Sequence, residues 1–133
     1  MKIVVDTNVF ISGVFFGGKP QEVLEAIVYG RVSGLCSTAI LEEYREIVER
    51  MIEKKGGTLN PGFLTTFYTK LQFVEASTCV KECRDPDDDK FLACAIDGVA
   101  YYVVSGGSDL VSLREFRGIK IVTASEFLSL LET

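Results

Sequence analysis

Apolar and polar residues alternate along the chain in blocks that predict strands and helices in turn. The first block is a β-branched run at residues 2–5, which ends at Asp6, Thr7 and Asn8, residue types that favour the start of a helix. Later apolar residues recur at helical spacing, which predicts helices at residues 21–29, 37–52, 60–71 and 87–96. Short apolar runs predict strands at residues 31–36, 72–75, 101–104 and 119–122, with a last helix after Thr123.

Strands that alternate with helices are typical of βαβ units. Such units build a central, mainly parallel sheet with helices on both faces. The chain of 133 residues has the length of one ordinary domain. We therefore expect a single α/β domain over residues 1–133.

Composition and charge limit the location and the partners. Apolar residues make up 47% of the chain, but no uninterrupted apolar stretch approaches the ~18 residues of a membrane span. Asp6 ends the first apolar run too early for a signal peptide. We therefore expect a cytoplasmic protein without a membrane partner. The net charge of −5 argues against binding nucleic acid through charge alone, because nucleic-acid-binding proteins are usually basic.

The numbers of cysteine and histidine residues limit the possible metal sites and catalytic mechanisms. The four cysteines form no Cys-x-x-Cys pair and the chain contains no histidine, so we expect free thiols and no structural zinc site. Without histidine, Ser-His and Cys-His nucleophilic mechanisms are excluded. Carboxylates are the remaining candidates for catalysis.

Acidic residues stand where a parallel sheet binds its ligands. Asp6 ends the first strand and residues 105–109, which include Asp109, follow another, so both lie at the carboxyl edge of the sheet. Asp88 shares a helical face with apolar Phe91 and Leu92, where a carboxylate is costly unless it is paired or bound to metal.

The long predicted helix contributes Glu43, the glutamate nearest to its buried flank. Each acid also has a purely structural interpretation. Asp6 can be a helix N-cap, Asp88 can belong to a solvated helix start, and Glu43 can be a surface charge paired with an arginine. Several carboxylates that converge without histidine would repel one another unless a hard cation, Mg²⁺ or Mn²⁺, took up their charge. Such a cation activates water and polarises a phosphodiester, which indicates hydrolysis.

Three segments resemble motifs of the PIN-domain family in the family's order, and the similarity covers nearly the whole chain. They are residues 4–9, 37–44 and 85–92. The resemblance assigns their acids, Asp6, Glu43 and Asp88, to the catalytic and metal-binding set, with Thr7 and Asn8 in support.

The fourth block, residues 104–110, departs from the family pattern. It reads Val-Ser-Gly-Gly-Ser-Asp-Leu where Thr-Gly-Asp-x-Asp-Leu is usual, so Gly107 stands in place of a carboxylate. Ser105 can still supply the expected hydroxyl, and Asp109 keeps the second acid. Asp109 either reaches the metal through the flexible Gly106-Gly107 loop or caps the helix that begins there.

The resemblance is to the branch of VapC-like toxins of toxin–antitoxin pairs. It implies a three-layer α/β/α sandwich, dependence on Mg²⁺ or Mn²⁺, and endoribonuclease activity on single-stranded RNA. It also implies an antitoxin partner and a homodimer.

Three other kinds of protein could also carry aspartates at strand ends, and two of them need a further residue. A catalytically weak PIN-like module could bind RNA or protein without cleavage, as Gly107 allows. A metal-dependent phosphatase would need an aspartate two residues after Asp6, where the chain has Asn8. A phospho-accepting receiver would need a partner lysine after a later strand, and no such lysine can be assigned.

Overall fold

A central sheet organises the chain. The computed structural model describes residues 1–54, 57–81, 83 and 85–132. Within these residues the sheet has six strands in the order β3-β2-β1-β4-β6-β5. All neighbouring strands are parallel except β5 and β6. The strands are β1 (Lys2–Val5), β2 (Ser33–Cys36), β3 (Gln72–Phe73), β4 (Tyr102–Val104), β5 (Glu115–Phe116) and β6 (Ile119–Val122).

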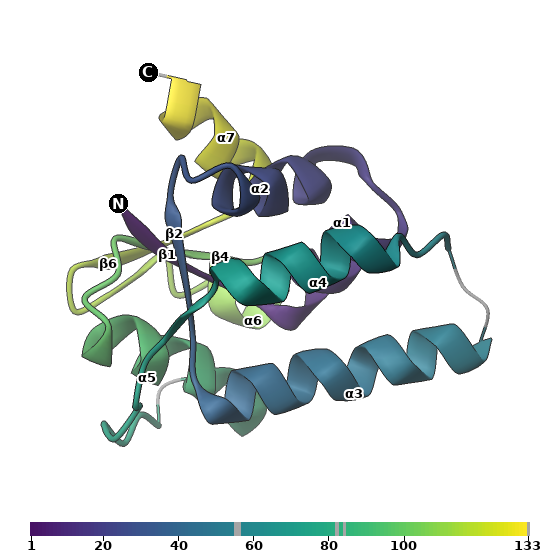
Figure 1. Ribbon diagram of the computed structural model, residues 1–133. Coiled ribbons are helices and arrows are strands. Elements are labelled where there is room, and N and C mark those ends of the chain that lie inside the picture. The colour runs from purple at the N-terminus through teal and green to yellow at the C-terminus, as the bar shows by residue number, and fades with distance from the viewer. Residues whose placement is uncertain (55–56, 82, 84, 133) are drawn as a thin grey trace.

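Helices cover both faces of this sheet. In Figure 1, α2 and α7 lie above the strands, and α3 and α5 lie below them. This arrangement confirms the predicted α/β/α sandwich. The helices are α1 (Thr7–Phe15), α2 (Gly18–Val28), α3 (Thr38–Lys54), α4 (Pro61–Lys70), α5 (Asp89–Asp97), α6 (Ser108–Val111) and α7 (Ala124–Glu132), and a 3₁₀ turn, η1 (Pro86–Asp88), precedes α5.

Strand β1 lies at the centre of the core. Its residues Ile3, Val4 and Val5 are almost fully buried, as expected for a parallel strand covered on both faces. The sheet hydrogen bonds continue past its end, because the Asp6 N–H donates to the Val104 carbonyl at 3.0 Å. The carboxyl ends of β1 and β4 therefore meet at one edge.

Local sequence explains where several helices start. The Asp6 side chain caps α1 by accepting from the Val9 N–H at 2.9 Å, and Asn60 caps α4 ahead of Pro61. Between α1 and α2 the chain turns at Gly17 and Gly18, whose φ angles of 78° and 70° lie in the left-handed region.

Some boundaries differ from the prediction. Helix α2 begins at Gly18 rather than at residue 21, because the chain turns at Gly17 and Gly18 themselves. Strand β3 ends at Phe73 rather than at residue 75, and it pairs on one side only, with β2. Helix α5 begins at Asp89 rather than near Asp87, because the 3₁₀ turn comes first.

One short strand was not predicted: β5, which pairs with β6 through a tight turn. The short helix expected to begin near Asp109 is α6, which starts at Ser108. Arg114 and Arg117 border β5 with φ angles of 61° and 50°, a left-handed conformation that their residue type does not announce.

Two predictions from composition can be compared with the structure. All four cysteines are free thiols, as predicted. Among the described residues, no helix combines the length and the apolar character that crossing a bilayer requires.

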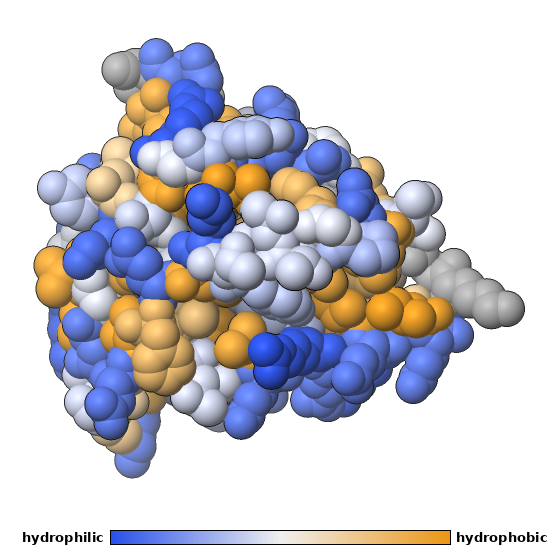
Figure 2. Space-filling model, in the orientation of Figure 1, coloured by the Kyte–Doolittle hydropathy of each residue, from blue (hydrophilic) through white to orange (hydrophobic). Residues whose placement is uncertain are grey.

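Tyr44 anchors α3 to the end of β1. Its buried ring stacks on Phe10 with centroids 4.0 Å apart, and its hydroxyl donates to the Val5 carbonyl. The outer face of α3 carries charged residues, and hydrophilic side chains line the lower edge of the molecule in Figure 2, where this helix runs. Helix α3 therefore buries one side and exposes the other.

We predict that Tyr44→Phe lowers the free energy of unfolding by about 1 to 2 kcal/mol, because the Val5 carbonyl loses a buried donor while the ring remains. Urea denaturation followed by circular dichroism would measure this loss. Tyr29→Phe is the matched control, since Tyr29 is 73% exposed and should change stability by less than about 0.5 kcal/mol. Equal midpoints for the two variants would contradict the anchoring role.

Candidate functional site

Asp6 is a buried carboxylate at the carboxyl edge of the sheet, with 4% of its surface exposed. One oxygen accepts from the Val9 N–H, and the other accepts from the Ser105 hydroxyl. Burial raises the pKa of Asp6, and the hydrogen bonds from Ser105 and from backbone N–H groups oppose that rise. Asp6 is therefore both the predicted N-cap and a carboxylate within a polar pocket.

Ser105 and Gly107 form the wall beside Asp6. Ser105 is fully buried, and its hydroxyl also accepts from the Gly107 N–H at 3.0 Å. A Cβ atom at Gly107 would lie 3.7 Å from Asn8 Nδ2 and 3.9 Å from Asp6 Oδ2, which are ordinary contact distances. A side chain at position 107 would thus point at the pocket without a clash.

Asp88 lies half-buried in the 3₁₀ turn before α5. Burial raises the pKa of Asp88 to about 6, and the negative charges of Asp85, Asp6, Asp109 and Glu43 add to that rise. These acids come from separate segments of the chain. The structure therefore brings Asp6, Glu43, Asp88 and Asp109 within electrostatic range of one another.

Glu43 reaches the site from α3 and has partners for both oxygens. The Thr7 hydroxyl donates to Oε2, and Lys90 Nζ lies 2.5 Å from Oε1. Other α3 glutamates behave as surface charges, as in the exposed pair of Glu46 with Arg50. Glu43 is thus distinguished from its neighbours by its contacts.

Asp109 lies in the first turn of the short helix α6, whose N-cap is Gly107. It is therefore not the capping residue, one of the two roles left open by the sequence. The φ of Gly107 is −83°, and Gly106 also has no positive φ, so this loop does not use the special backbone freedom of glycine.

Family comparison identifies the fold and the group of proteins. A family model described as PIN domain matches residues 2–108. The chain belongs to the PIN-domain family. An uncharacterized protein from Methanocaldococcus jannaschii is 31% identical over 96% of this chain and 90% of that protein. PIN domains are typically nucleases.

A solved structure shares the fold. It is the crystal structure of VapBC2 from Rickettsia felis bound to a DNA fragment from their promoter. The match has a TM-score of 0.61 and 14% identity, and it covers 91% of this chain and 97% of that chain. At this identity the likeness concerns the fold alone.

The donor chemistry of this PIN-domain site suits a hard cation. The four acids offer only oxygen atoms, which Mg²⁺ and Mn²⁺ prefer. Nearby Cys83 has a pKa raised to about 12 by burial and by Asp89, so it stays protonated and offers no thiolate. As the side chains stand in residues 1–54, 57–81, 83 and 85–132, no three acidic or thiol groups lie close enough to hold one ion together. The fit therefore rests on the chemistry of the donors.

Lys90 was missed as a site residue by sequence reasoning. It falls inside the third PIN motif, directly after Asp88 and Asp89, and this position was the available signal. Its contact with Glu43 joins residues 47 positions apart, so it depends on how α5 packs against α3.

Asp97 holds the loop that leads to the third PIN motif. Its carboxylate accepts from the Thr78 hydroxyl, from the Thr78 N–H at 2.9 Å and from the Ser77 N–H at 2.7 Å. These hydrogen bonds, that of the Thr78 hydroxyl first, lower the pKa of Asp97. The end of α5 is thereby tied to the segment that precedes the acidic turn.

We predict that Asp97→Asn lowers the urea midpoint at pH 7, because an amide oxygen accepts these hydrogen bonds more weakly than a carboxylate. The folded pKa lies below the ordinary 3.8, so the stabilisation is present above that pH and is lost as the pH falls through the folded value. The difference between variant and wild type should therefore shrink below about pH 3.8. Glu49→Gln, on the exposed side of α3, controls for the loss of one charge. A difference independent of pH would exclude this linkage.

Proposed function

We propose that this PIN-domain protein is a metal-dependent endoribonuclease that hydrolyses single-stranded RNA. The observation that supports it is that Asp6, at the carboxyl edge of the parallel sheet, Glu43 of α3 and Asp109 of α6 all lie within electrostatic range of Asp88. Ligands of open parallel sheets bind at that edge. Carboxylate oxygens suit a hard cation, which can orient and activate water in a site that has no histidine.

Asp6, Asp88 and Asp109 would hold Mg²⁺ or Mn²⁺, with Glu43 bound directly or through water. When bound, such a cation lowers the pKa of water and neutralises charge that develops on the phosphodiester. Ser105 keeps Asp6 oriented through its hydroxyl, and Thr7 does the same for Glu43. A positive ion is also what would let a phosphate approach a chain of net charge −5.

The choice of single-stranded RNA as substrate rests on the resemblance to VapC-like PIN domains. A pocket of about 480 Å³ is lined in part by Thr7 and Asn8, which follow Asp6 in the chain, and by Gly106. Unpaired bases can enter such a pocket, whereas the bases of a duplex stay stacked.

We extend the proposal to a role as the toxin of a toxin–antitoxin pair, with an antitoxin protein as partner and a homodimer as the assembly. The likeness of the fold to VapBC2 supports this role. A small neighbouring gene whose product copurifies with this chain and stops RNA cleavage would support the pairing. Light scattering of the purified chain would test the dimer.

We predict that Asp6→Asn and Asp88→Asn each reduce cleavage of single-stranded RNA by at least about 100-fold, or roughly 2.7 kcal/mol. Each change removes a charge from the proposed cation site with little change in side-chain volume. Cleavage of a labelled RNA in Mn²⁺ buffer would measure the rates, and circular dichroism would confirm folding.

Asp87→Asn is the control for these two variants. Asp87 is the exposed neighbour of Asp88 in the same turn, so its loss should change the rate by less than about threefold. Near wild-type cleavage by folded Asp6→Asn would refute the assignment.

Gly107 favours a second candidate function, a catalytically weak PIN-like module that binds RNA or protein. The family pattern has a carboxylate at this position, and the pocket wall here is bare backbone. In this alternative the remaining acids would bind a cation too weakly to support efficient cleavage.

The two candidates predict different effects of Gly107→Asp and Asp109→Asn. If the natural site is fully active, Asp109→Asn should be as damaging as Asp6→Asn, and Gly107→Asp should change the rate little. If the site is weakened, Gly107→Asp should raise the rate at least about tenfold, since a carboxylate there can face Asp6 without a clash, and a tenfold gain corresponds to about 1.4 kcal/mol. Single-turnover RNA cleavage would measure both variants.

A further inference from the structure

Lys90 makes an ion pair inside the acidic site. Its Nζ lies 2.5 Å from Glu43 Oε1, while Thr7 donates to Oε2, so both oxygens of this carboxylate are engaged. The two side chains are only 22% and 26% exposed. For comparison, the Arg50–Glu46 pair on the surface of α3 is 59% exposed on both sides. Solvent therefore screens the Lys90 contact less than an ordinary surface pair.

The surroundings of this pair are acidic. Lys90 follows Asp88 and Asp89 directly, and Glu43 adds to the rise in the pKa of Asp88 through its negative charge. The Lys90 ammonium also lies 5.9 Å from the centre of the Phe91 ring, a cation–π distance. The positive charge of Lys90 thus contacts Glu43, one of the carboxylates that act on Asp88.

We propose that Lys90 is the built-in cation of this site: it competes with a divalent cation for Glu43 and so sets the cation concentration at which the site is filled. The proposal rests on the proposed function in that it takes the acids to bind Mg²⁺ or Mn²⁺. An ammonium and a divalent ion on the same carboxylate repel each other, so the Lys90 contact weakens the hold of Glu43 on the ion. Lysine has a flexible stem that allows its ammonium to move aside. Lys90 is then a positioning residue for Glu43.

Removal of the Lys90 ammonium should strengthen the binding of a divalent ion. Lys90→Met keeps an unbranched side chain of similar length and removes one positive charge beside the acids. Glu43 Oε1 then loses its ammonium partner and can meet a divalent ion without competition, and we expect the Kd for Mn²⁺ to fall at least about fivefold. Lys90→Arg keeps the charge and should stay within about twofold of wild type.

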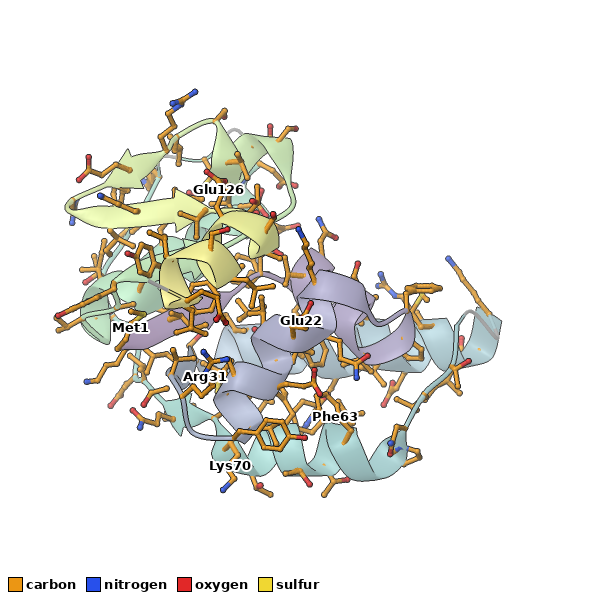
Figure 3. All side chains as sticks on the ribbon, turned by 90° about the horizontal axis from the view of Figure 1, so that it is seen from above. Met1, Glu22, Arg31, Phe63, Lys70 and Glu126 are labelled. Atoms are coloured by element: carbon orange, nitrogen blue, oxygen red, sulfur yellow. The ribbon has the colours of Figure 1, made fainter. Side chains whose placement is uncertain are left out.

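Electron paramagnetic resonance measures the concentration of free Mn²⁺ while the ion is added to metal-free protein. This measurement does not depend on enzyme activity. Lys70→Met is the matched control, because it removes the same charge from the exposed end of α4, which Figure 3 shows at the periphery of the molecule. Its Kd should match that of wild type within about twofold. A Lys90→Met variant whose Kd is unchanged or weaker would overturn the proposal.

The competition for Glu43 can be separated from a general effect of charge. In a Glu43→Gln background, Lys90→Met should alter the Mn²⁺ Kd by less than about twofold, because the contested carboxylate is gone. If the fivefold gain persists there, Lys90 acts at a distance and the proposed competition is wrong.

A measurement on the wild-type chain covers the case that Lys90→Met does not fold. Titration with Mg²⁺ should shift the ε-methylene NMR signals of Lys90 in step with site filling, and unshifted signals at saturation would refute displacement. The nuclease proposal fails separately. If RNA is not cleaved but Lys90→Met still lowers the Mn²⁺ Kd fivefold, the nuclease proposal is refuted and the role of Lys90 stands. If RNA is cleaved but the Kd of Lys90→Met is unchanged, the role of Lys90 is refuted and the nuclease proposal stands.

Discussion

The parallel pairing of β1 with both β2 and β4 is the constraint on which the rest of the structure depends. Ile3 lies opposite Gly34 on one side and opposite Tyr102 on the other, and this register carries Asp6 to the end of β4. A shift by one residue would move Asp6 away from the Val104 carbonyl and from Ser105. Gly34 lets α2 approach closely, since a Cβ atom there would lie 2.7 Å from Ile27 Cδ1.

That register forces a carboxylate into the interior, and the fold offsets the cost locally. The cost of burying the Asp6 carboxylate is offset by hydrogen bonds from Val9, from Ser105 and from the backbone of the loop after β4. The Ser105 N–H is itself fixed by the Val122 carbonyl at 2.8 Å, so the hydroxyl that meets Asp6 is held by the sheet. The same backbone geometry that builds the sheet thereby orients the acid.

Charge is distributed unevenly over the molecule. The exposed face of α3 carries glutamates and arginines that are solvated and contribute little beyond solubility. At the carboxyl edge, by contrast, buried and half-buried acids from distant segments lie within electrostatic range of Asp88, and Lys90 pairs with one of them, Glu43. Among the described residues, partial burial and the Lys90–Glu43 pair distinguish this edge from the solvated face of α3.

The sequence by itself determined the features that depend on neighbours along the chain. The mainly parallel α/β sandwich, the Asp6 cap and the strand ends at Asp6 and Ser105 follow from local periodicity and capping chemistry, and the structure agrees with each. The assignment of the acids to catalysis and metal binding stays a prediction. The predicted start of helix α5 was two residues too early. Residue propensity marks helix ends poorly where a 3₁₀ turn intervenes.

Only the tertiary structure decided which side chains meet. The Thr7–Glu43 and Lys90–Glu43 contacts join residues 36 and 47 positions apart, and no spacing rule encodes them, because they exist only once α3 packs beside α1 and α5. For the same reason, strand β3 was predicted too long and strand β5 was not predicted. Each depends on hydrogen bonds from a neighbouring strand rather than on its own residues, and such pairing is specified by the assembled sheet.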